Sequence, residues 1–158
     1  MFAGCTALEV IDYFNSKFDM SGSKLSTMLG MAHGCTNLKT FSFIPKGGTF
    51  EYIDSNGLES FVDGCNNLTN ITLITGSTLK YGIDLDGIPN YPNWETLLTH
   101  LAGEEVDGKI IGVCYRFEEG EADESLNKGV LWLPRNVDEA LVKEFQRKTN
   151  WIVPILND

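Results

Sequence analysis

Three cysteines occur at a constant spacing, and their thiols are the side chains of this chain with the widest chemistry. Cys5, Cys35 and Cys65 each follow a glycine and lie thirty residues apart. A thiolate can bind zinc, form a disulfide or attack as a nucleophile. Zinc ligands usually come in short pairs such as C-x-x-C, which this sequence lacks, and three thiols at one phase of a repeat cannot all pair with one another. We therefore expect buried free thiols that serve as small core side chains.

The other candidate groups form no catalytic or cofactor motif. His33 and His100 are the only histidines, and neither lies in an H-x-x-x-H or H-E-x-x-H pattern. No nucleophile, base and orienting group stand at suggestive positions, and no glycine-rich segment has the order that holds a phosphate. The sequence therefore predicts no catalytic residues, no cofactor and no metal site, and an enzyme of unknown type is the least supported hypothesis.

Two acidic segments carry the oxygen ligands that calcium prefers. One is the loop 118–128, which contains five carboxylates, and the other is the sequence DLDG from Asp84 to Gly87. Neither has the spacing of a known calcium loop. A solvated charge run is the ordinary interpretation of both, and calcium binding by the loop 118–128 stays open.

The overall charge excludes one class of partner. The chain has 158 residues and a formal net charge of −10 at pH 7. A surface that binds nucleic acid should be basic, so we expect no nucleic-acid partner. No segment approaches the roughly 18 apolar residues of a membrane-spanning helix, so we expect no membrane insertion.

The cysteines belong to a repeat whose units must stack. Apolar residues follow each cysteine at +3, +6 and +8, as in Leu38, Phe41 and Phe43, and the last two have strand spacing. The apolar residues before each glycine have helical spacing. Each unit is predicted to contain a short helix, a glycine turn, a buried cysteine and a short strand, and stacked units form a solenoid with a parallel sheet. We expect three such repeats over residues 1–74.

Residues 75–158 lack the Gly-Cys signal, and we expect diverged repeat units and a C-terminal cap. Apolar spacing predicts a helix over 93–102, capped by Asn93, and another over 136–149. Alternating apolar residues predict strands over 108–117 and 129–134, joined as a hairpin, and a final strand over 150–156. A solenoid must cover the core exposed at its end, which accounts for such a cap. An independent α+β domain is the alternative.

The N-terminal end has no predicted cap. Met1 stands at the phase of Met31, inside a unit, whereas the terminal repeats of an isolated solenoid need capping. We expect that the chain is cut from a longer protein, or that an assembly partner covers this end.

Three segments, MFAGCTALEVI, MLGMAHGCTNLKTFSF and FVDGCNNLTNITLI, resemble BspA-like leucine-rich repeats. That family occurs in bacterial surface proteins and in some phage tail and fibre proteins. The likeness covers Met1 to about Ile74, and it departs from many leucine-rich repeats where Ser16, Lys46 and Gly76 replace an asparagine. It implies an α/β leucine-rich-repeat solenoid with a parallel sheet and short helices, and a binding or scaffold role without catalytic residues.

The strands of the repeat should turn one face outward. Residues at +6 and +8 point inward, so those at +5, +7 and +9 point outward. The +7 column is polar and the +9 column is apolar, and together they give the candidate binding residues Asp12, Phe14, Ser42, Ile44, Thr72 and Ile74. The +9 column forms an exposed stripe for contacts or, if the chain bends after +8, part of the core.

These features favour a non-enzymatic module that binds a protein or a surface glycan. The resemblance implies a fragment of a bacterial surface or adhesion-type protein, placed at the cell surface or secreted. The alternative is a structural or receptor-binding component of a phage virion, such as a tail or fibre part, whose N-terminal end docks on another subunit.

Overall fold

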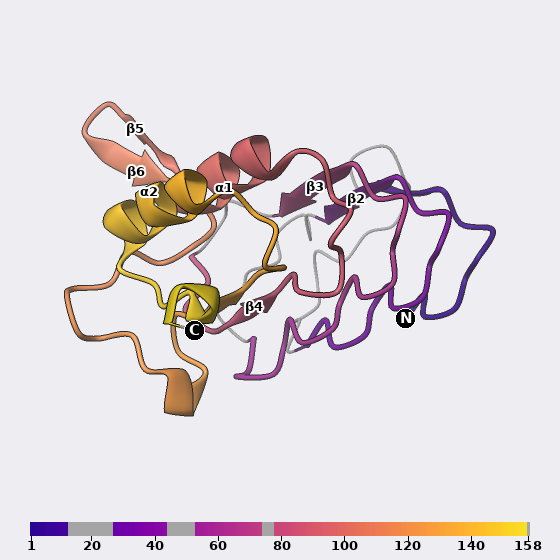
Figure 1. Cartoon of the computed structure of the whole chain (residues 1–158), viewed down its shortest axis with the longest axis horizontal. Helices are drawn as coiled ribbons and strands as arrows, with labels where there is room; N and C mark the ends of the chain where they lie inside the picture. The colour runs from indigo at the N-terminus through magenta and orange to yellow at the C-terminus, as the bar shows by residue number, and fades with distance from the viewer. Residues whose placement is uncertain (13–26, 44–52, 74–77, 158) are drawn as a thin grey trace.

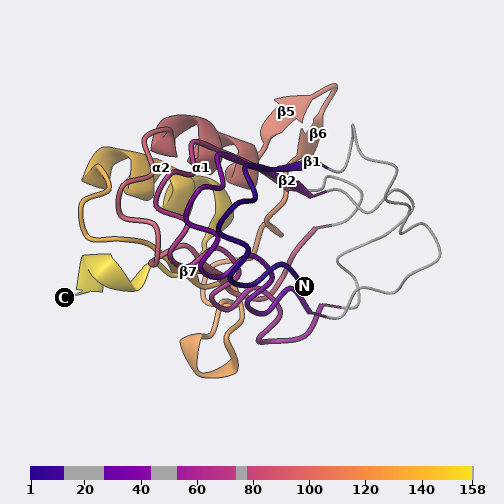
Figure 2. The same cartoon turned by 90° about the vertical axis from the view of Figure 1, so that its right-hand side faces the viewer.

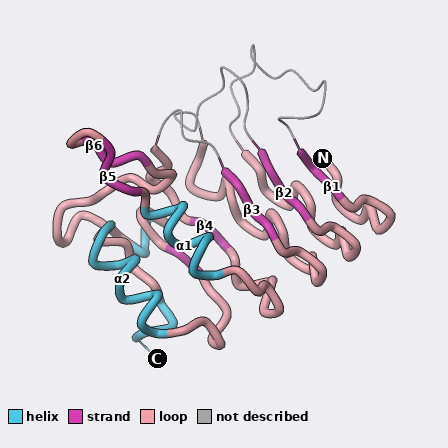
Figure 3. The backbone as a smooth tube through the Cα atoms, turned by 90° about the horizontal axis from the view of Figure 1, so that it is seen from above, coloured by secondary structure: helices cyan, strands magenta, loops and turns pink. Residues whose placement is uncertain are grey.

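Three short strands form a parallel sheet whose register follows the sequence repeat. The computed structural model describes residues 1–12, 27–43, 53–73 and 78–157. The strands are β1 (Val10–Asp12), β2 (Thr40–Phe43) and β3 (Asn70–Leu73), in this order across the sheet. Each residue pairs with the residue thirty positions later, from Val10 to Thr40 and from Thr40 to Asn70. Figure 3 shows the strands side by side, and Figure 2 shows their units one behind another.

The segment before each glycine forms turns, so the predicted short helices are wrong. In the second unit, the amide of Met31 donates to the carbonyl of Met28 over 3.0 Å, which is the i→i+3 pattern of a turn. The amide of Ala32 donates to the carbonyl of Phe61 in the next unit over 2.8 Å. An α-helix needs its amides for its own carbonyls. Bonding between stacked units therefore replaces helical bonding in this segment.

A glycine in the left-handed region precedes each cysteine, as the sequence predicts. The φ angles are +74° at Gly4, +75° at Gly34 and +78° at Gly64, and L side chains rarely adopt such values. A Cβ on Gly64 would lie 3.5 Å from the Cα of Gly34. The turns of neighbouring units therefore approach one another closely, backbone to backbone.

The apolar columns of the repeat are buried most completely in the second and third units. At +3 and +6, Leu38, Phe41, Leu68 and Ile71 are buried, whereas Leu8 in the first unit is half-buried. A fully buried side chain of this size contributes about 1.5–3 kcal/mol. The difference follows from position, because the second unit has a described unit on each side and the first has one on a single side only.

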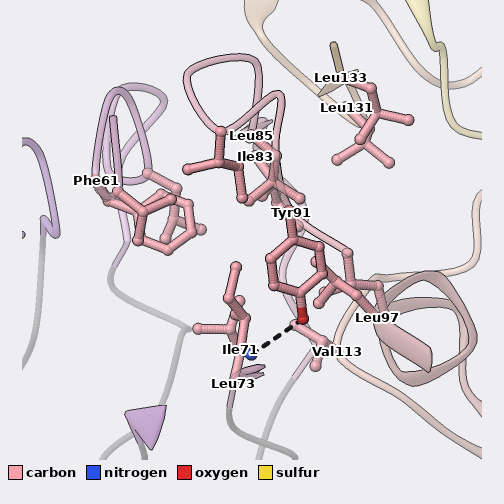
Figure 4. Close-up of a cluster of buried hydrophobic side chains, with 14 of the residues drawn as sticks. Phe61, Ile71, Leu73, Ile83, Leu85, Tyr91, Leu97, Val113, Leu131 and Leu133 are labelled. Carbon is pink, nitrogen blue, oxygen red and sulfur yellow. Dashed lines mark hydrogen bonds between the residues drawn. The ribbon is translucent and has the colours of Figure 1, made fainter. Parts of the chain in front are cut away.

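Two side chains occupy the outer edge of β3. The hydroxyl of Tyr91 accepts a hydrogen bond from the amide of Ile71 over 3.2 Å. The Nε2 atom of His100 lies 3.2 Å from the amide nitrogen of Leu73 and 3.1 Å from its carbonyl oxygen. Figure 4 shows the Tyr91 bond within the buried cluster. The side chains of Tyr91 and His100 thus contact the backbone groups of β3 with which a further strand would otherwise form hydrogen bonds.

Asn93 bonds at the same edge and does not cap the helix that follows it. Helix α1 spans Trp94–Ala102, close to the predicted range, but no side-chain hydrogen bond caps its N-terminus. The side-chain nitrogen Nδ2 of Asn93 instead donates to the backbone carbonyl of Thr69 over 2.6 Å. The predicted cap is wrong because this side chain is already engaged with the third unit.

The two helices of the second half lie side by side, as Figure 1 shows. Helix α1 lies between β3 and helix α2 (Glu139–Thr149), which confirms the second predicted helix. Strand β4 (Ile83–Asp84) pairs in parallel with β7 (Leu131–Trp132). Two 3-10 turns, η2 (Glu124–Leu126) and η3 (Pro154–Asn157), also lie in this part.

The predicted hairpin joins the wrong segments. Strands β5 (Glu104–Val106) and β6 (Lys109–Ile111) form the antiparallel pair, connected by Asp107 and Gly108, which both have positive φ. An Asp-Gly pair favours this tight two-residue turn. Residues of the two predicted strands pair in parallel elsewhere: Cys114 bridges Leu79, and Leu131 pairs with Ile83.

The predicted final strand is reduced to one parallel bridge, between Val130 and Ile152. The 3-10 turn η3 begins immediately afterwards at Pro154. Proline has no amide to donate to a ladder, which accounts for the short pairing. The parallel sense of the bridge is the one expected for a strand, a helix and a strand in succession.

Candidate functional site

The described part of the sheet brings three of the predicted binding residues into one row. Asp12, Ser42 and Thr72 are direct partners in the register of the three strands. Asp12 and Thr72 are half-buried, but Ser42 is only 7% exposed. We expected the three polar side chains at +7 to be open to solvent, and this is wrong for Ser42. Ser42 is buried because Asp12 lies next to it on one side and Thr72 on the other. The remaining candidates, at positions 14, 44 and 74, lie outside the described residues.

A second row on the same face is more open to solvent. Val10, Thr40 and Asn70 are register partners at the +5 position. Val10 is 52% exposed, Asn70 is exposed and Thr40 is half-buried. Alternation along a strand places +5 and +7 on one face. We call the six residues of these two rows the outer sheet face.

The thiols of the repeat are held as hydrogen-bond donors inside the stack. The sulfur of Cys35 donates to the carbonyl of Phe2 over 3.0 Å, and that of Cys65 donates to the carbonyl of Ala32 over 3.1 Å. Burial raises the pKa of the Cys65 thiol to about 11, so it stays protonated at neutral pH and is a poor nucleophile. Cys5 is also free but exposed, and the prediction of a buried thiol is wrong there.

Two of the five carboxylates in the acidic loop accept hydrogen bonds from residues of the same loop. The Asp123 carboxylate accepts hydrogen bonds from the amide and the hydroxyl of Ser125, over 2.9 and 2.6 Å, and these bonds lower its pKa. The Glu121 side chain accepts from the amide of Glu118 over 3.1 Å. Among the residues that the structure describes, no group of three or more His, Cys, Asp or Glu side chains has an arrangement suited to a metal ion.

A pocket of about 380 Å³ lies where four separate segments meet. The segments are the turn before Gly64, strand β4 with the turn after it, η2, and strand β7. The side chains that give the pocket its chemistry are Glu59, Asp84, Asp86, Glu124, Asn127 and Trp132. Asp84, Asp86 and Glu124 belong to the two acidic segments of the sequence, but nothing in the spacing of Glu59 or Trp132 indicated that they would join them.

Asp84 is the most buried carboxylate of the pocket. Its two oxygens accept hydrogen bonds from the amides of Ser60 and Asp86, both over 3.1 Å. Ser60 has a φ of +51°, and this turn directs its amide toward Asp84. Burial raises the pKa of the Asp84 carboxyl, and the negative charges of Asp63 and Asp86 raise it further, against the lowering effect of the two amides.

Beside Asp84, the pocket lining contains a side-chain amide, that of Asn127, and an indole, that of Trp132, the register partner of Asp84. The side-chain nitrogen of Asn127 donates to the carbonyl of Ser55, and its side-chain oxygen is buried without a hydrogen-bond partner among the described residues. A Cβ on Gly82 would overlap that oxygen and lie 2.6 Å from the ring of Trp132. Glycine at position 82 therefore lets both side chains approach the backbone, and Trp132 remains half-buried.

No family model, no curated protein and no solved structure matches this chain. The leucine-rich-repeat family and its solenoid therefore stay predictions that depend on the three sequence segments. In residues 1–12, 27–43, 53–73 and 78–157, the structure contains no helix with both the length and the apolar character needed to cross a bilayer.

Proposed function

We propose that this chain is a non-enzymatic binding module that recognises a protein or a surface glycan through the outer sheet face. The observation that supports this most directly is the thirty-residue register, which places equivalent side chains of the three units in rows. Neighbouring strands in a sheet lie about 4.8 Å apart. A row is therefore a closely spaced set of side chains on a rigid backbone, which suits recognition of an extended ligand.

The chemistry of the two rows fits a polar ligand with one apolar contact. Val10 is the exposed apolar group, and Asn70, Thr40 and Thr72 supply hydrogen-bonding groups on the same face. On the resemblance of its repeats to the BspA-like family, we place the module in a bacterial surface or secreted protein.

A phage virion component is the second candidate. The feature that favours it is the position of β1 at the end of the described sheet, where β2 is its only neighbour among the described strands. Exposed Val10 lies on that strand, and exposed Cys5 lies in the same unit. An unpaired strand edge can accept another chain, so a neighbouring subunit could dock there.

The test uses a glycan array and a panel of purified extracellular-matrix proteins as probes. The double variant Val10→Lys with Asn70→Lys changes two exposed positions of the outer sheet face, and Lys143→Ala on α2 is the control. We expect the double variant to lose binding by about tenfold or more, since a few interface side chains carry most of the binding energy and these two are the most exposed of the face. The control should keep wild-type affinity. Unchanged binding of the double variant, or no binding of the wild type to either panel, would reject the proposal.

A further inference from the structure

The 380 Å³ pocket is a second feature of the molecule that could hold a ligand. The pocket lies away from the sheet β1–β2–β3. Figure 1 shows two of the elements that line it, β4 and the orange turn η2, below β2 and β3. Ligand sites commonly have volumes of about 300–1,000 Å³. No residue of β1, β2 or β3 lines the pocket, so its function is separable from that of the outer sheet face.

The pocket concentrates negative charge without a compensating cation. Glu59, Asp86 and Glu124 are exposed around the half-buried Asp84, and no lysine, arginine or histidine is among the described lining residues. Lys128, which follows Asn127 in the chain, is directed elsewhere, with its ammonium nitrogen 5.6 Å from the ring centroid of Phe117. Four carboxylates around one hollow repel one another, and a bound positive charge would relieve that repulsion.

Two further groups in the wall point to an organic cation. Trp132 lines the pocket and is half-buried, and an indole is the side chain that attracts ammonium and guanidinium groups most strongly. The buried oxygen of Asn127 has no hydrogen-bond partner among the described residues, so its dipole adds to the negative potential of the wall. An indole beside carboxylates is the combination that binds the flat, multiply donating head of arginine.

Two other ligand classes fit less well. A calcium or magnesium ion needs several oxygens converging on one point, and the described carboxylates do not form such a group. A neutral sugar would stack on Trp132 but would leave the charges of the four carboxylates uncompensated. A cation that carries its charge on an extended organic frame meets both the ring and the separated carboxylates.

We propose that the pocket of Glu59, Asp84, Asp86, Glu124 and Trp132 binds a guanidinium or ammonium group of an organic cation. Such a group occurs on the arginine or lysine side chains of a basic protein segment, and it also occurs on a free polyamine. The inference does not depend on the proposed function, because the two ligand sites share no residue.

The experiment is isothermal titration calorimetry of the full chain with three probes. These are a nonapeptide rich in arginine, the same peptide with citrulline in place of arginine, and spermine. Citrulline keeps the shape of arginine and removes its charge. The pocket variant is Glu59→Gln with Glu124→Gln. Its control is Glu119→Gln with Glu121→Gln, which changes net charge equally at exposed positions outside the pocket lining.

We expect the arginine peptide to bind and the citrulline peptide to bind at least about tenfold more weakly. The pocket variant should lose about tenfold in affinity, whereas the control should lose less than about twofold. Trp132→Leu should weaken the arginine peptide further while leaving the outer sheet face intact. Spermine binding as tightly as the peptide would identify a polyamine source, and peptide binding alone would identify a protein segment.

Three results would overturn the proposal. The first is the absence of binding by both the arginine peptide and spermine. The second is equal binding of the arginine and citrulline peptides. The third is an equal loss in the pocket variant and its control, which would show attraction to the net negative charge of the chain and not to this pocket. A circular dichroism spectrum and a melting curve for each variant establish that its fold is retained.

Discussion

The hydroxyl oxygen of Tyr91 lies 3.2 Å from the backbone nitrogen of Ile71 and accepts its hydrogen. The amide of Ile71 faces outward along the sheet, in the direction in which a fourth strand would pair. Together with Asn93 and His100, Tyr91 ends the ladder of strands with side chains of the following segment. Removal of one hydrogen-bonding atom at the edge of β3 should therefore change the stability of the protein. The first two predictions concern Tyr91 and His100 at this edge.

Tyr91→Phe should destabilise the protein by about 1–3 kcal/mol, since it leaves a buried backbone amide without an acceptor. Tyr91 is 5% exposed, whereas Tyr81 is 37% exposed. Tyr81→Phe is therefore the control and should change the free energy of unfolding by less than about 0.5 kcal/mol. Urea unfolding of the three proteins gives both values. Equal stability of the wild type and Tyr91→Phe would mean that another group satisfies the amide.

His100 should make stability depend on pH in the mildly acidic range. Burial lowers the pKa of His100 from 6.5, against the opposing effect of its contact with Leu73. The unfolded chain then binds more protons than the native one between the lowered value and 6.5, so stability falls as pH drops below about 6.5. The free energy of unfolding should decrease more between about pH 7.5 and 5.5 in the wild type than in His100→Gln. His33→Gln, at an exposed site, should retain the wild-type slope, and a flat wild-type profile would contradict the prediction.

Leu38→Ala should cost about 2–5 kcal/mol, the range for truncating a buried leucine. Leu38 has 0% exposure in the unit between the two others. Leu126 is 62% exposed in η2, and Leu126→Ala should cost less than about 1 kcal/mol. Thermal or chemical unfolding measures both. A midpoint for Leu38→Ala that stays near the wild-type value would reject the stacked register.

The four thiols should react in two classes. Cys5 is exposed, whereas Cys35, Cys65 and Cys114 are buried, and burial also raises the pKa of Cys114 well above its usual value. A chromogenic disulfide reagent should therefore label one thiol rapidly in the native protein and four after denaturation. Cys5→Ser should remove the rapid phase. Rapid native labelling of Cys35 would show that the stack opens.

The sequence could predict the sheet because the information for it is periodic. Leu38 and Leu68 stand at the same phase of a thirty-residue repeat, and identical phases must pack alike when units stack. The prediction of short helices was wrong because of hydrogen bonds to a different unit. The amide of Ala32 bonds to Phe61 in the next unit, and apolar spacing within one unit carries no sign of that competition.

The second half was predictable for its helices and not for its strand pairing. The apolar stripe of α2, with Val142 and Phe145 buried, is a local pattern. The Asp107–Gly108 turn was a local signal too, and the longer apolar run after it obscured its importance. The pocket was beyond prediction, because Trp132 reaches it through the parallel pairing of β4 with β7, and Glu59 through a turn whose next residue, Ser60, bonds to Asp84 of β4.

The uniform register between units bears on how such a chain can change length. Both strand pairs of the sheet β1–β2–β3 join residues thirty positions apart, so a tandem duplication of thirty residues adds a unit that its neighbours already fit. An insertion of one residue within a strand would instead turn its apolar side chains to the other face. Growth by whole units leaves the contacts of Tyr91, Asn93 and His100 with the last strand unchanged. The number of thirty-residue units can thus change by gene duplication, while the segment with Tyr91, Asn93 and His100 continues to cover the edge of the last strand.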